Sequence, residues 1–399
     1  MIGTATNALP SLGEGAHDQP IRVAHVAGFS ETSASGVDRT VAGLVRHLAR
    51  CGVQPEVWHL SPGHASVKER RAGSVRVVEL PAHRRARSAL VGLPEATRRF
   101  VDERRDGIDV LHLHSVFIPD NVWVARVARR PYVLTPNGGY APEILRGRNR
   151  VAKMVWMRWR ERDYVRAASL VHSVSPREVE QLQATFGVDT LMFAPNAIDL
   201  PAESVSPQHR MGLSPKLVVF LGRLAVDHKG LDVLLEGYAR YLKSSGDSGS
   251  ELVIAGPDFR SGRAKLLQMA GSQLPSGRVR LPGPLFGEDK DALLRSAYVF
   301  VHTSRWEGMP YAVLEALATG CPVLLTSATN LGEFVERSGA GVVVDGTPEG
   351  VREGLTTILT ASADRYGAMC EASLRLASQR FTWSVVAEQV AGAYRAILV

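Results

Sequence analysis

Two glutamates eight positions apart, Glu307 and Glu315, carry the clearest chemical signal in this sequence. A Gly-Met-Pro segment follows the first glutamate, and its proline suits the first turn of a helix predicted over 311–319. Glu307 is therefore expected in a loop and Glu315 on the second turn of that helix. Carboxylates accept hydrogen bonds from hydroxyl groups, and free N–H groups at a helix start bind anions. The stretch predicts a pocket for a ligand that carries hydroxyl groups and phosphate.

A second segment offers two cations for the phosphate. Arg223 and Lys229 bracket a loop flanked by Gly222 and Gly230, directly after a buried strand predicted over 217–221. Each charge-assisted hydrogen bond to a diphosphate would contribute about 1.5–3 kcal/mol. Taken singly, Lys229 is better explained as an ordinary surface lysine, but its position beside Arg223 and the two glycines reverses that interpretation. Together with the two glutamates they predict a nucleotide-sugar site, in which cations meet the diphosphate and carboxylates accept from sugar hydroxyls.

The first half of the chain supplies three further candidates. Gly36 precedes a helix predicted over 37–50 and allows a phosphate to approach the backbone closely. His112 and His114 are expected to alternate across a strand, so that His114, nearest the strand end, faces the ligand. Asn137, in a Thr-Pro-Asn-Gly-Gly turn, both donates to and accepts from hydroxyl groups. Plain turn chemistry and a structural histidine are the alternatives.

Alternating strands and helices must position these residues. Strand-like segments separated by helical patterns favour mostly parallel sheets covered on both faces, in which ligands bind at the carboxyl ends of the strands. In the first half these segments are 21–26, 55–59, 75–80, 110–113, 132–135 and 170–173. In the second half they are 217–221, 252–255, 278–281, 298–301 and 321–326.

The 399 residues are too many for one compact core and predict two α/β domains. Residues 1–20 have the composition of a disordered leader, and 21–200 form the first domain. A Ser- and Pro-containing linker is predicted over 201–215. The second domain covers 216–380, and the helix over 381–399 ends the chain.

Composition is ordinary for a globular protein, with 45% hydrophobic and 22% charged residues. No run of 18 apolar residues predicts a membrane span. The three cysteines lie far apart, without a CxxC pair, so that neither a disulfide framework nor a zinc site is expected. These features favour the reducing cytoplasm.

The net charge of +7 belongs entirely to residues 1–200, which hold 27 Lys and Arg against 20 Asp and Glu. A basic helix predicted over 143–167 also carries tryptophans and methionines, including Trp156 and Trp159. Such a helix can bind an anionic membrane surface, or it can pack its aromatic side and expose its charges. No nucleic-acid-binding module accompanies the charge. Asp289-Lys290-Asp291 has the DxD form of some metal-nucleotide sites, but acids at a helix start have the simpler explanation of helix capping.

GRLAVDHKG, EGMPYAVLEALATGCPV and TNLGEF occur in this order, and with them the chain resembles the retaining family-4 glycosyltransferases of the GT-B fold. The resemblance is strong over 216–345 and weaker over 21–200. It implies two Rossmann-like domains facing each other across a cleft, with the last helix crossing back to the first domain. The implied enzyme moves a hexose from a UDP- or GDP-sugar to a hydroxyl of a glycan, lipid-linked or small-molecule acceptor, without a cofactor or metal.

The resemblance also implies roles for individual residues. Arg223 and Lys229 would hold the diphosphate and stabilise its departing charge, Glu307 would bind donor-sugar hydroxyls, and Glu315 would bind the ribose. Gly36 matches the glycine loop of the first domain, and His114 matches its strand-end histidine. The backbone N–H groups near the sugar and phosphate would come from the loop and helix start that contain Gly308, Met309, Pro310, Tyr311 and Ala312.

One departure from the family pattern is Asn137, which stands where many members have a histidine near the reacting side of the sugar. A catalytically silent nucleotide-sugar-binding subunit is therefore one alternative, and another GT-B enzyme, such as a sugar-nucleotide epimerase or a phosphorylase, is a second. The basic first half makes a peripheral position at the inner face of the cell membrane a further hypothesis.

Overall fold

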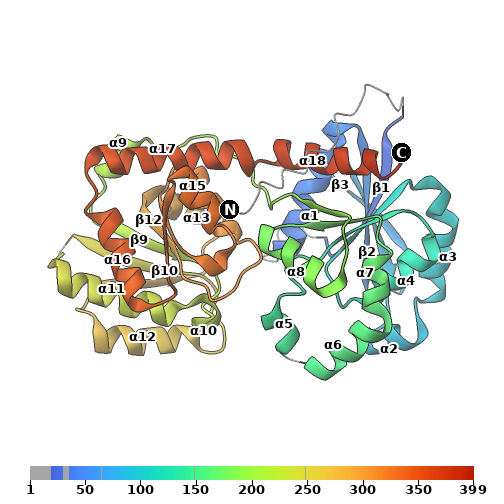
Figure 1. Cartoon of the computed structure of the whole chain (residues 1–399), viewed down its shortest axis with the longest axis horizontal. Helices are drawn as coiled ribbons and strands as arrows, with labels where there is room; N and C mark the ends of the chain where they lie inside the picture. The colour runs from blue at the N-terminus through green and yellow to red at the C-terminus, as the bar shows by residue number, and fades with distance from the viewer. Residues whose placement is uncertain (1–18, 30–35, 64, 148, 248) are drawn as a thin grey trace.

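The computed structural model describes residues 19–29, 36–63, 65–147, 149–247 and 249–399. The leader predicted over 1–20 falls almost entirely outside these residues. Two α/β domains stand side by side, and two long helices near the C-terminus run along one edge of both domains (Figure 1). Each domain is organised around one sheet, with eight strands in the first and six in the second. The predicted architecture of two doubly wound domains is confirmed.

The first sheet has the strand order β3-β4-β2-β1-β5-β6-β7-β8, and only the edge strand β3 is antiparallel to its neighbour. Every residue of the central strand β5 is buried, as expected where helices cover both faces. The short edge strands β3 and β8 were not predicted; β3 reads Lys-Glu-Arg-Arg-Ala and lacks an apolar pattern because its side chains are mostly exposed. The strands are β1 (Ile21–Val26), β2 (Val53–Ser61), β3 (Lys68–Ala72), β4 (Val75–Pro81), β5 (Val110–His114), β6 (Tyr132–Thr135), β7 (Leu170–Ser173) and β8 (Leu191–Phe193).

The helices of the first domain correct one prediction. The single basic helix expected over 143–167 is instead a short first helix and, after a break at Gly147 and Asn149, an unbroken helical run over 150–166 made of three pieces; Asn149 adopts a left-handed φ of 64°. One of these pieces is a π-helical turn, a rare conformation that often marks functional sites. The α-helices are α1 (Gly36–Leu48), α2 (Arg85–Val91), α3 (Glu95–Arg104), α4 (Pro119–Ala128), α5 (Pro142–Arg146), α6 (Arg150–Trp156), α7 (Arg162–Arg166) and α8 (Pro176–Phe186), and the π-helical turn is η3 (Met157–Glu161).

The second sheet is parallel throughout, in the order β11-β10-β9-β12-β13-β14. Its central strand β9 buries Val219 and Leu221 in one core and Val218 and Phe220 in the other, since successive side chains point to opposite faces. The strands are β9 (Lys216–Leu221), β10 (Ser250–Ala255), β11 (Val279–Gly283), β12 (Ala297–His302), β13 (Val323–Thr326) and β14 (Gly341–Val344). The helices are α10 (Val226–Lys229), α11 (Leu231–Ser245), α12 (Gly262–Gln273), α13 (Gly287–Ser296), α14 (Tyr311–Ala318), α15 (Gly332–Ser338), α16 (Pro348–Leu359) and α17 (Ala363–Arg380).

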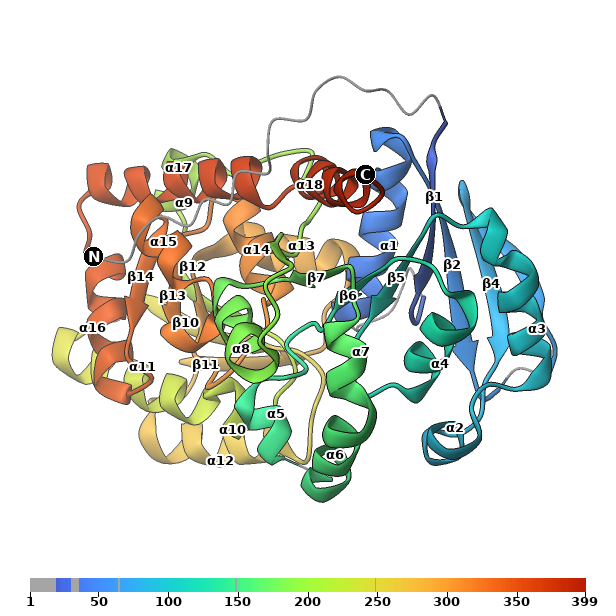
Figure 2. The ribbon, with the colours of Figure 1, turned by 45° about the vertical axis from the view of Figure 1, so that its right-hand side comes forward.

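The chain passes between the domains twice, and the two passages touch each other. Ile198 and Thr382 form an isolated bridge, after which α18 (Trp383–Ala396) packs against α1 of the first domain (Figure 2). The stretch 201–215, expected as a linker, contains the helix α9 (Pro207–Met211). Within α9 the buried Arg210 donates to the Thr319 carbonyl at 2.8 Å, which ties this stretch to the second domain.

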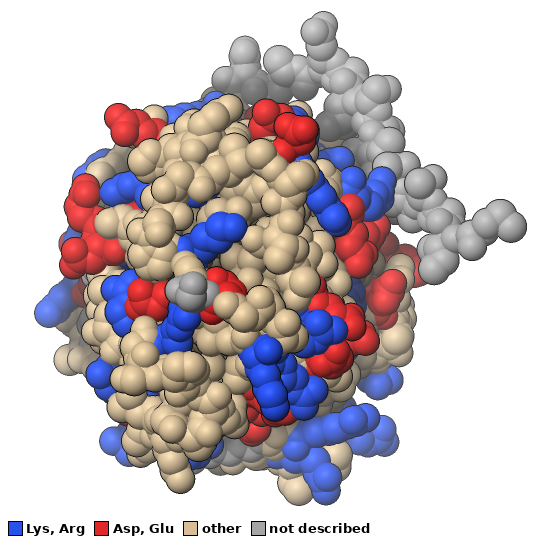
Figure 3. All heavy atoms as spheres, turned by 90° about the vertical axis from the view of Figure 1, so that its left-hand side faces the viewer, with Lys and Arg blue, Asp and Glu red and all other residues tan. Residues whose placement is uncertain are grey.

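Charge is evenly mixed on the outer end of the second domain. Acidic and basic side chains alternate there with uncharged surface (Figure 3), in keeping with the zero net charge of residues 201–399. Among the helices that the structure describes, none has the length and apolar character required to cross a bilayer.

Candidate active site

The loops after β9 and β12 place Lys229 directly against Glu307. Gly230 follows Lys229 with a left-handed φ of 59°, and a Cβ there would lie 2.1 Å from the Thr303 carbonyl oxygen, so that only glycine permits this approach. The Thr303 hydroxyl donates to the carbonyl groups of Lys229 and Gly230 at 3.1 and 2.9 Å. The two loops are thereby locked together, and the Lys229 ammonium forms an ion pair with the Glu307 carboxylate.

One oxygen of Glu307 makes all the contacts of this carboxylate. Oε1 accepts from Lys229, from Ser304 Oγ at 2.7 Å and from His302 Nε2 at 3.1 Å. Oε2 has no partner in the described part of the chain and is not sealed from solvent. Burial alone would raise the pKa of Glu307, but the hydrogen bond from His302 and the charge of Lys229 outweigh burial and lower that pKa. Glu307 is therefore ionised and offers one oxygen to a hydroxyl donor.

Arg223 lies at the start of the same β9 loop. Its exposed guanidinium reaches no carboxylate among the described residues and lies 5.4 Å from the ring centroid of Phe259. Burial lowers the pKa of His228, and the charges of Glu307, Lys229 and Arg223 all act on this ring. The two predicted cations and the first predicted carboxylate thus lie within electrostatic range of one side chain of the second domain.

The helix that carries Glu315 begins with unpaired donors. Pro310 is the residue before the first helical turn, with ψ of 119°, and not a member of that turn as expected. Within the described residues, no acceptor meets the N–H groups of Gly308, Met309, Tyr311 and Ala312. Asn330 donates to the carbonyl groups of residues 307 and 308 at 2.6 and 2.9 Å and holds the loop. The result is a set of N–H groups suited to an anion, next to Lys229 and Glu307.

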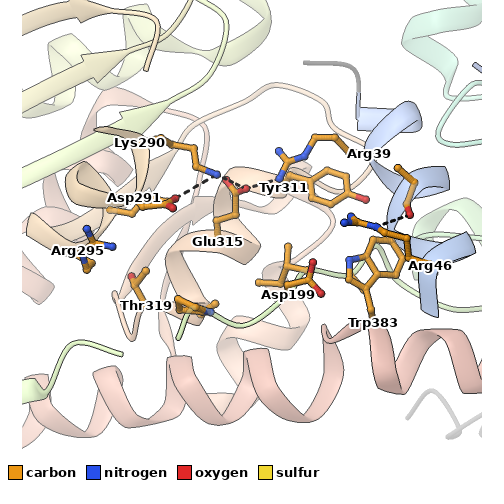
Figure 4. A pocket seen from close by; sticks show the side chains of 16 residues that line it. Arg39, Arg46, Asp199, Lys290, Asp291, Arg295, Tyr311, Glu315, Thr319 and Trp383 are labelled. Atoms are coloured by element: carbon orange, nitrogen blue, oxygen red, sulfur yellow. Dashed lines mark hydrogen bonds and ion pairs between the residues drawn. The ribbon is translucent and has the colours of Figure 1, made fainter. Parts of the chain in front are cut away.

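Glu315 lines a cavity of about 340 Å³ between the two domains. Arg39 from α1 and Lys290 from α13 reach its carboxylate from opposite sides (Figure 4). Both cations donate to Oε1, at 2.5 and 2.8 Å, while Oε2 has no partner among the described residues. Lys290, the centre of the DxD-like motif, also lies 3.5 Å from Asp291. The ammonium group of Lys290 therefore pairs with the carboxylates of both Asp291 and Glu315.

The first domain closes on the helix start of α14. The Tyr311 hydroxyl lies 2.7 Å from Thr40 Oγ1, and a Cβ on Gly36 would lie 3.9 Å from the Tyr311 ring. A Cβ on Gly138 would lie 3.4 Å from the Gly308 Cα atom, beside the carbonyl of Asn137. Gly36 and the Asn137 turn therefore face the segment from Gly308 to Tyr311 across the cleft. Ser35, the neighbour of Gly36, is outside the described residues.

One predicted site residue, His114, has no described contact with Lys229, Glu307 or the start of α14. It is buried and pairs with His25, whose Nδ1 lies 3.1 Å from His114 Nε2. The expectation that His112 and His114 alternate was wrong, because residues two apart share one face of a strand. Their rings stack with centroids 4.2 Å apart, and His112 is held by Tyr394 and Thr135, both at 2.6 Å.

Sequence reasoning missed several residues that shape the site. His302 and Ser304 precede Glu307 by five and three positions, and the Ser-x-x-Glu spacing was a local signal for one of them. Arg39 carried no signal, because its partner Glu315 lies 276 positions further along the chain. Asn196 donates to the Met309 carbonyl at 3.1 Å across the domain boundary, and a partner 113 positions away leaves no local signal.

Comparison with known proteins covers both domains. Residues 34–201 match the model for Glycosyltransferase Family 4, and residues 215–376 match that for Glycosyl transferases group 1. The phosphatidyl-myo-inositol mannosyltransferase of Mycobacterium leprae is 27% identical over 390 residues, which are 94% of this chain and 97% of that protein. The GDP-mannose-dependent alpha-mannosyltransferase of Mycolicibacterium smegmatis is 29% identical over 401 residues, 95% of this chain and 98% of that protein.

The fold has solved counterparts. HepE from Anabaena, determined in complex with UDP and glucose, has a TM-score of 0.71 and 17% identity, and the match covers 94% of this chain and 100% of HepE. That likeness shows the fold alone. The two family models show the family, and together they match most of both domains. The chain belongs to the family-4 glycosyltransferases, with the two facing Rossmann-like domains of the GT-B fold.

Proposed function

We propose that this glycosyltransferase moves a hexose from a nucleoside diphosphate sugar to an acceptor hydroxyl in the cleft between its domains. The observation that carries the proposal is the Lys229–Glu307 pair beside the unpaired N–H groups of the α14 start. The N–H groups and the two cations suit a diphosphate, and the open oxygens of Glu307 and Glu315 suit sugar hydroxyls. Both requirements are met within one cleft.

In the proposed reaction the acceptor oxygen bonds to the anomeric carbon as the bond between that carbon and the diphosphate oxygen breaks. Negative charge grows on the departing diphosphate, and Arg223, Lys229 and the helix start stabilise it. The acceptor proton passes to the departing phosphate, so that attack comes from the same face and the anomeric configuration is retained. Glu307 is ionised but is held by three donors, which suits sugar binding better than nucleophilic attack. We propose that these cations act without a metal ion.

The names of the relatives indicate a donor class and an acceptor class, and both are proposals for this chain. Two full-length relatives are named as mannosyltransferases, one GDP-mannose-dependent and one acting on phosphatidyl-myo-inositol. A GDP- or UDP-hexose is therefore the donor class to test first, and a lipid-linked hydroxyl is the first acceptor class. His114 is buried, and its role in the reaction stays a prediction.

A thermal-shift screen of UDP-, GDP- and ADP-sugars tests the proposal. A donor at 100 times its Kd should stabilise the folded protein by about 2.7 kcal/mol. Release of the nucleoside diphosphate, followed with and without candidate acceptors, then separates a transferase from a silent binder. Absence of any shift across the three donor families would overturn the proposal. Inorganic phosphate should not be required for turnover, whereas a phosphorylase would need it.

The first domain supports a second proposal, peripheral binding to an anionic membrane surface. Val151, Met154, Val155 and Trp159 are 65%, 60%, 60% and 49% exposed. Cations surround them, and Lys153, Arg158 and Arg162 line a cavity of about 290 Å³ together with Met154. Exposed apolar side chains among cations are the combination that binds anionic lipid.

Vesicle co-sedimentation tests this surface. We expect binding to vesicles containing anionic lipid, little binding to zwitterionic vesicles, and loss of binding when Arg158, Arg160 and Arg162 are changed to Gln. Changing Arg365, Arg375 and Arg380 of α17 to Gln removes the same charge from the exposed face of another domain and should preserve binding. Equal losses in both triple variants would show that net charge alone is responsible.

A further inference from the structure

Arg223 and Lys229 are held in very different ways. The Lys229 side chain is 11% exposed and is fixed by its ion pair with Glu307. Arg223 is exposed and has no acidic partner among the described residues. Its guanidinium carbon lies 5.4 Å from the centroid of the Phe259 ring, the aromatic face that supports it in the described part of the chain. A cation over an aromatic face is attracted by the ring electrons, and such contacts form within about 6 Å.

The loop that carries Phe259 is built onto the loop that carries Arg223. Leu224 N–H donates to the Pro257 carbonyl at 2.9 Å, and Leu224 forms a bridge with Asp258. A Cβ on Gly256 would lie 1.8 Å from the Gly222 carbonyl oxygen, and one on Gly262 would lie 1.8 Å from that of Leu224. These approaches leave no space between the two loops, so that the Phe259 backbone is fixed relative to Arg223.

The Phe259 turn keeps an uncommon backbone conformation. Arg260 and Ser261 directly after it have φ of 52° and 60°, in the left-handed region that non-glycine residues rarely adopt. The Asp258 carboxylate accepts from the Arg263 N–H at 2.9 Å and helps to hold this turn. Left-handed non-glycine residues persist where the surroundings determine them, and they cluster at ligand-binding sites.

We propose that Phe259 is a positioning residue that holds the Arg223 guanidinium where the donor diphosphate binds. The inference rests on the proposed function, because it assigns Arg223 to that diphosphate. Phe259 touches no reacting atom in this scheme and acts only through Arg223. An exposed arginine without such a partner samples many rotamers and loses that freedom when it binds, so that an aromatic support raises affinity by reducing this loss.

The second exposed aromatic residue on this side of the domain provides a contrast. Phe286 lies on the neighbouring loop after β11 and is 66% exposed, against 36% for Phe259. No cation lies over the Phe286 ring among the described residues. The ring of Phe259, by contrast, also has the guanidinium of Arg260 at 5.1 Å. An Arg260→Gln variant therefore tests whether this second cation competes with Arg223 for the ring.

Titration calorimetry with UDP and with GDP tests the proposal. Phe259→Leu keeps an apolar side chain without the aromatic face and should weaken binding of the nucleoside diphosphate about two- to fivefold. Phe259→Tyr keeps the face and should bind like the wild type. In steady-state assays Phe259→Leu should raise the donor KM more than it lowers kcat, with the melting temperature unchanged.

A double-mutant cycle separates positioning from a general structural effect. In an Arg223→Gln background, Phe259→Leu should cause no further loss of affinity, because the group it positions is gone. Additive losses in the double variant, or full affinity in Phe259→Leu, would overturn the inference while leaving the proposed function intact. If the wild type binds neither UDP nor GDP and no UDP-, GDP- or ADP-sugar shifts its melting temperature, the proposed function itself fails.

Discussion

Glu307 and Glu315 each commit one carboxylate oxygen to cations of the protein and keep the other free within the described chain. The paired oxygen fixes the orientation of the group, and for Glu307 its partners also lower the pKa of the carboxyl. The free oxygen can then accept from a sugar hydroxyl without displacing an ion pair. Aspartate is one methylene shorter than glutamate, so that replacing either residue with aspartate would move this oxygen away from the sugar hydroxyl. Binding therefore depends on the length of the side chain as well as on its charge.

Removal of Arg223 and removal of Lys229 should both lower activity, but they should differ in their effect on stability. Arg223→Ala should lower kcat/KM by about 10- to 100-fold through the loss of one charge-assisted hydrogen bond, with little change in melting temperature because Arg223 is exposed. Lys229→Met should lower activity similarly and also destabilise the protein by about 1–3 kcal/mol, because Glu307 stays buried without its cation.

Turnover assays run in parallel with thermal melts measure this difference. Arg337→Ala, which removes an exposed arginine from α15, is the control and should change neither quantity. Near-normal turnover in Arg223→Ala, or a melting loss equal to that of Lys229→Met, would contradict the assignment.

At the scale of elements, the sequence predicted most of the second domain because its signals are local. The buried strand β12, the Gly-Met-Pro loop, the helix α14 and the glycine after it follow one another within 24 residues, and Gly320 does take the left-handed φ of 76° that ends such a helix. The prediction of one helix over 143–167 was wrong because contacts distant in the sequence shape this stretch. Its π-helical turn is held by the buried Glu161, which accepts from Phe117 N–H at 2.9 Å and Tyr140 Oη at 2.8 Å, partners that no local pattern announces.

The junction of α1 and α18 makes an element-scale prediction. A Cβ on Gly43 of α1 would lie 2.1 Å from the Trp383 indole, which is buried against the first domain. Gly43→Ala should therefore push α18 away and destabilise the protein by about 1–3 kcal/mol. Gly392→Ala in α18 meets nothing within 4 Å and should stabilise the protein by about 0.5–1 kcal/mol, since alanine favours a helix over glycine.

Denaturant unfolding of the two alanine variants gives these free energies directly. Both substitutions add one methyl group to a helix, so the difference between them isolates the contact with Trp383. If Gly43→Ala proves as stable as Gly392→Ala, α18 does not pack on α1 as described.

At the scale of the whole molecule, the second crossing of the chain ties the first domain to the end of the sequence. Trp383, Val386, Val390 and Tyr394 of α18 belong to the same core as Ile21, Val23 and Leu44 of the first domain. The Tyr394 hydroxyl also lies 2.6 Å from His112, so that this helix completes a buried network of histidines in the sheet. Folding of the first domain therefore depends on residues of α18, which follow the second domain in the sequence, a dependence invisible to any local sequence pattern.

That histidine network predicts loss of stability in mild acid. Burial lowers the pKa of His25 to about 3 and that of His172 to about 4, and it lowers the pKa values of His112 and His114 well below 6.5. In the unfolded chain the four rings titrate near 6.5, so below this pH the unfolded state binds more protons and gains stability. At pH 5.5, one unit below the pKa of the unfolded chain, each ring that stays neutral in the fold costs on the order of 1 kcal/mol.

The sum over four rings, on the order of several kcal/mol at pH 5.5, is comparable with the total stability of many domains. Asp120, Glu161 and Glu178 act in the opposite direction, because burial raises the pKa of each carboxyl, but they are three groups against the four rings of this network. Melting temperatures between pH 7.5 and 5.0 should therefore fall steeply below about 6.5. His172→Gln removes one titrating ring and should flatten that fall, whereas exposed His209→Gln should not. A melting temperature that stays level down to pH 5 would mean that these four rings are not held neutral in the fold.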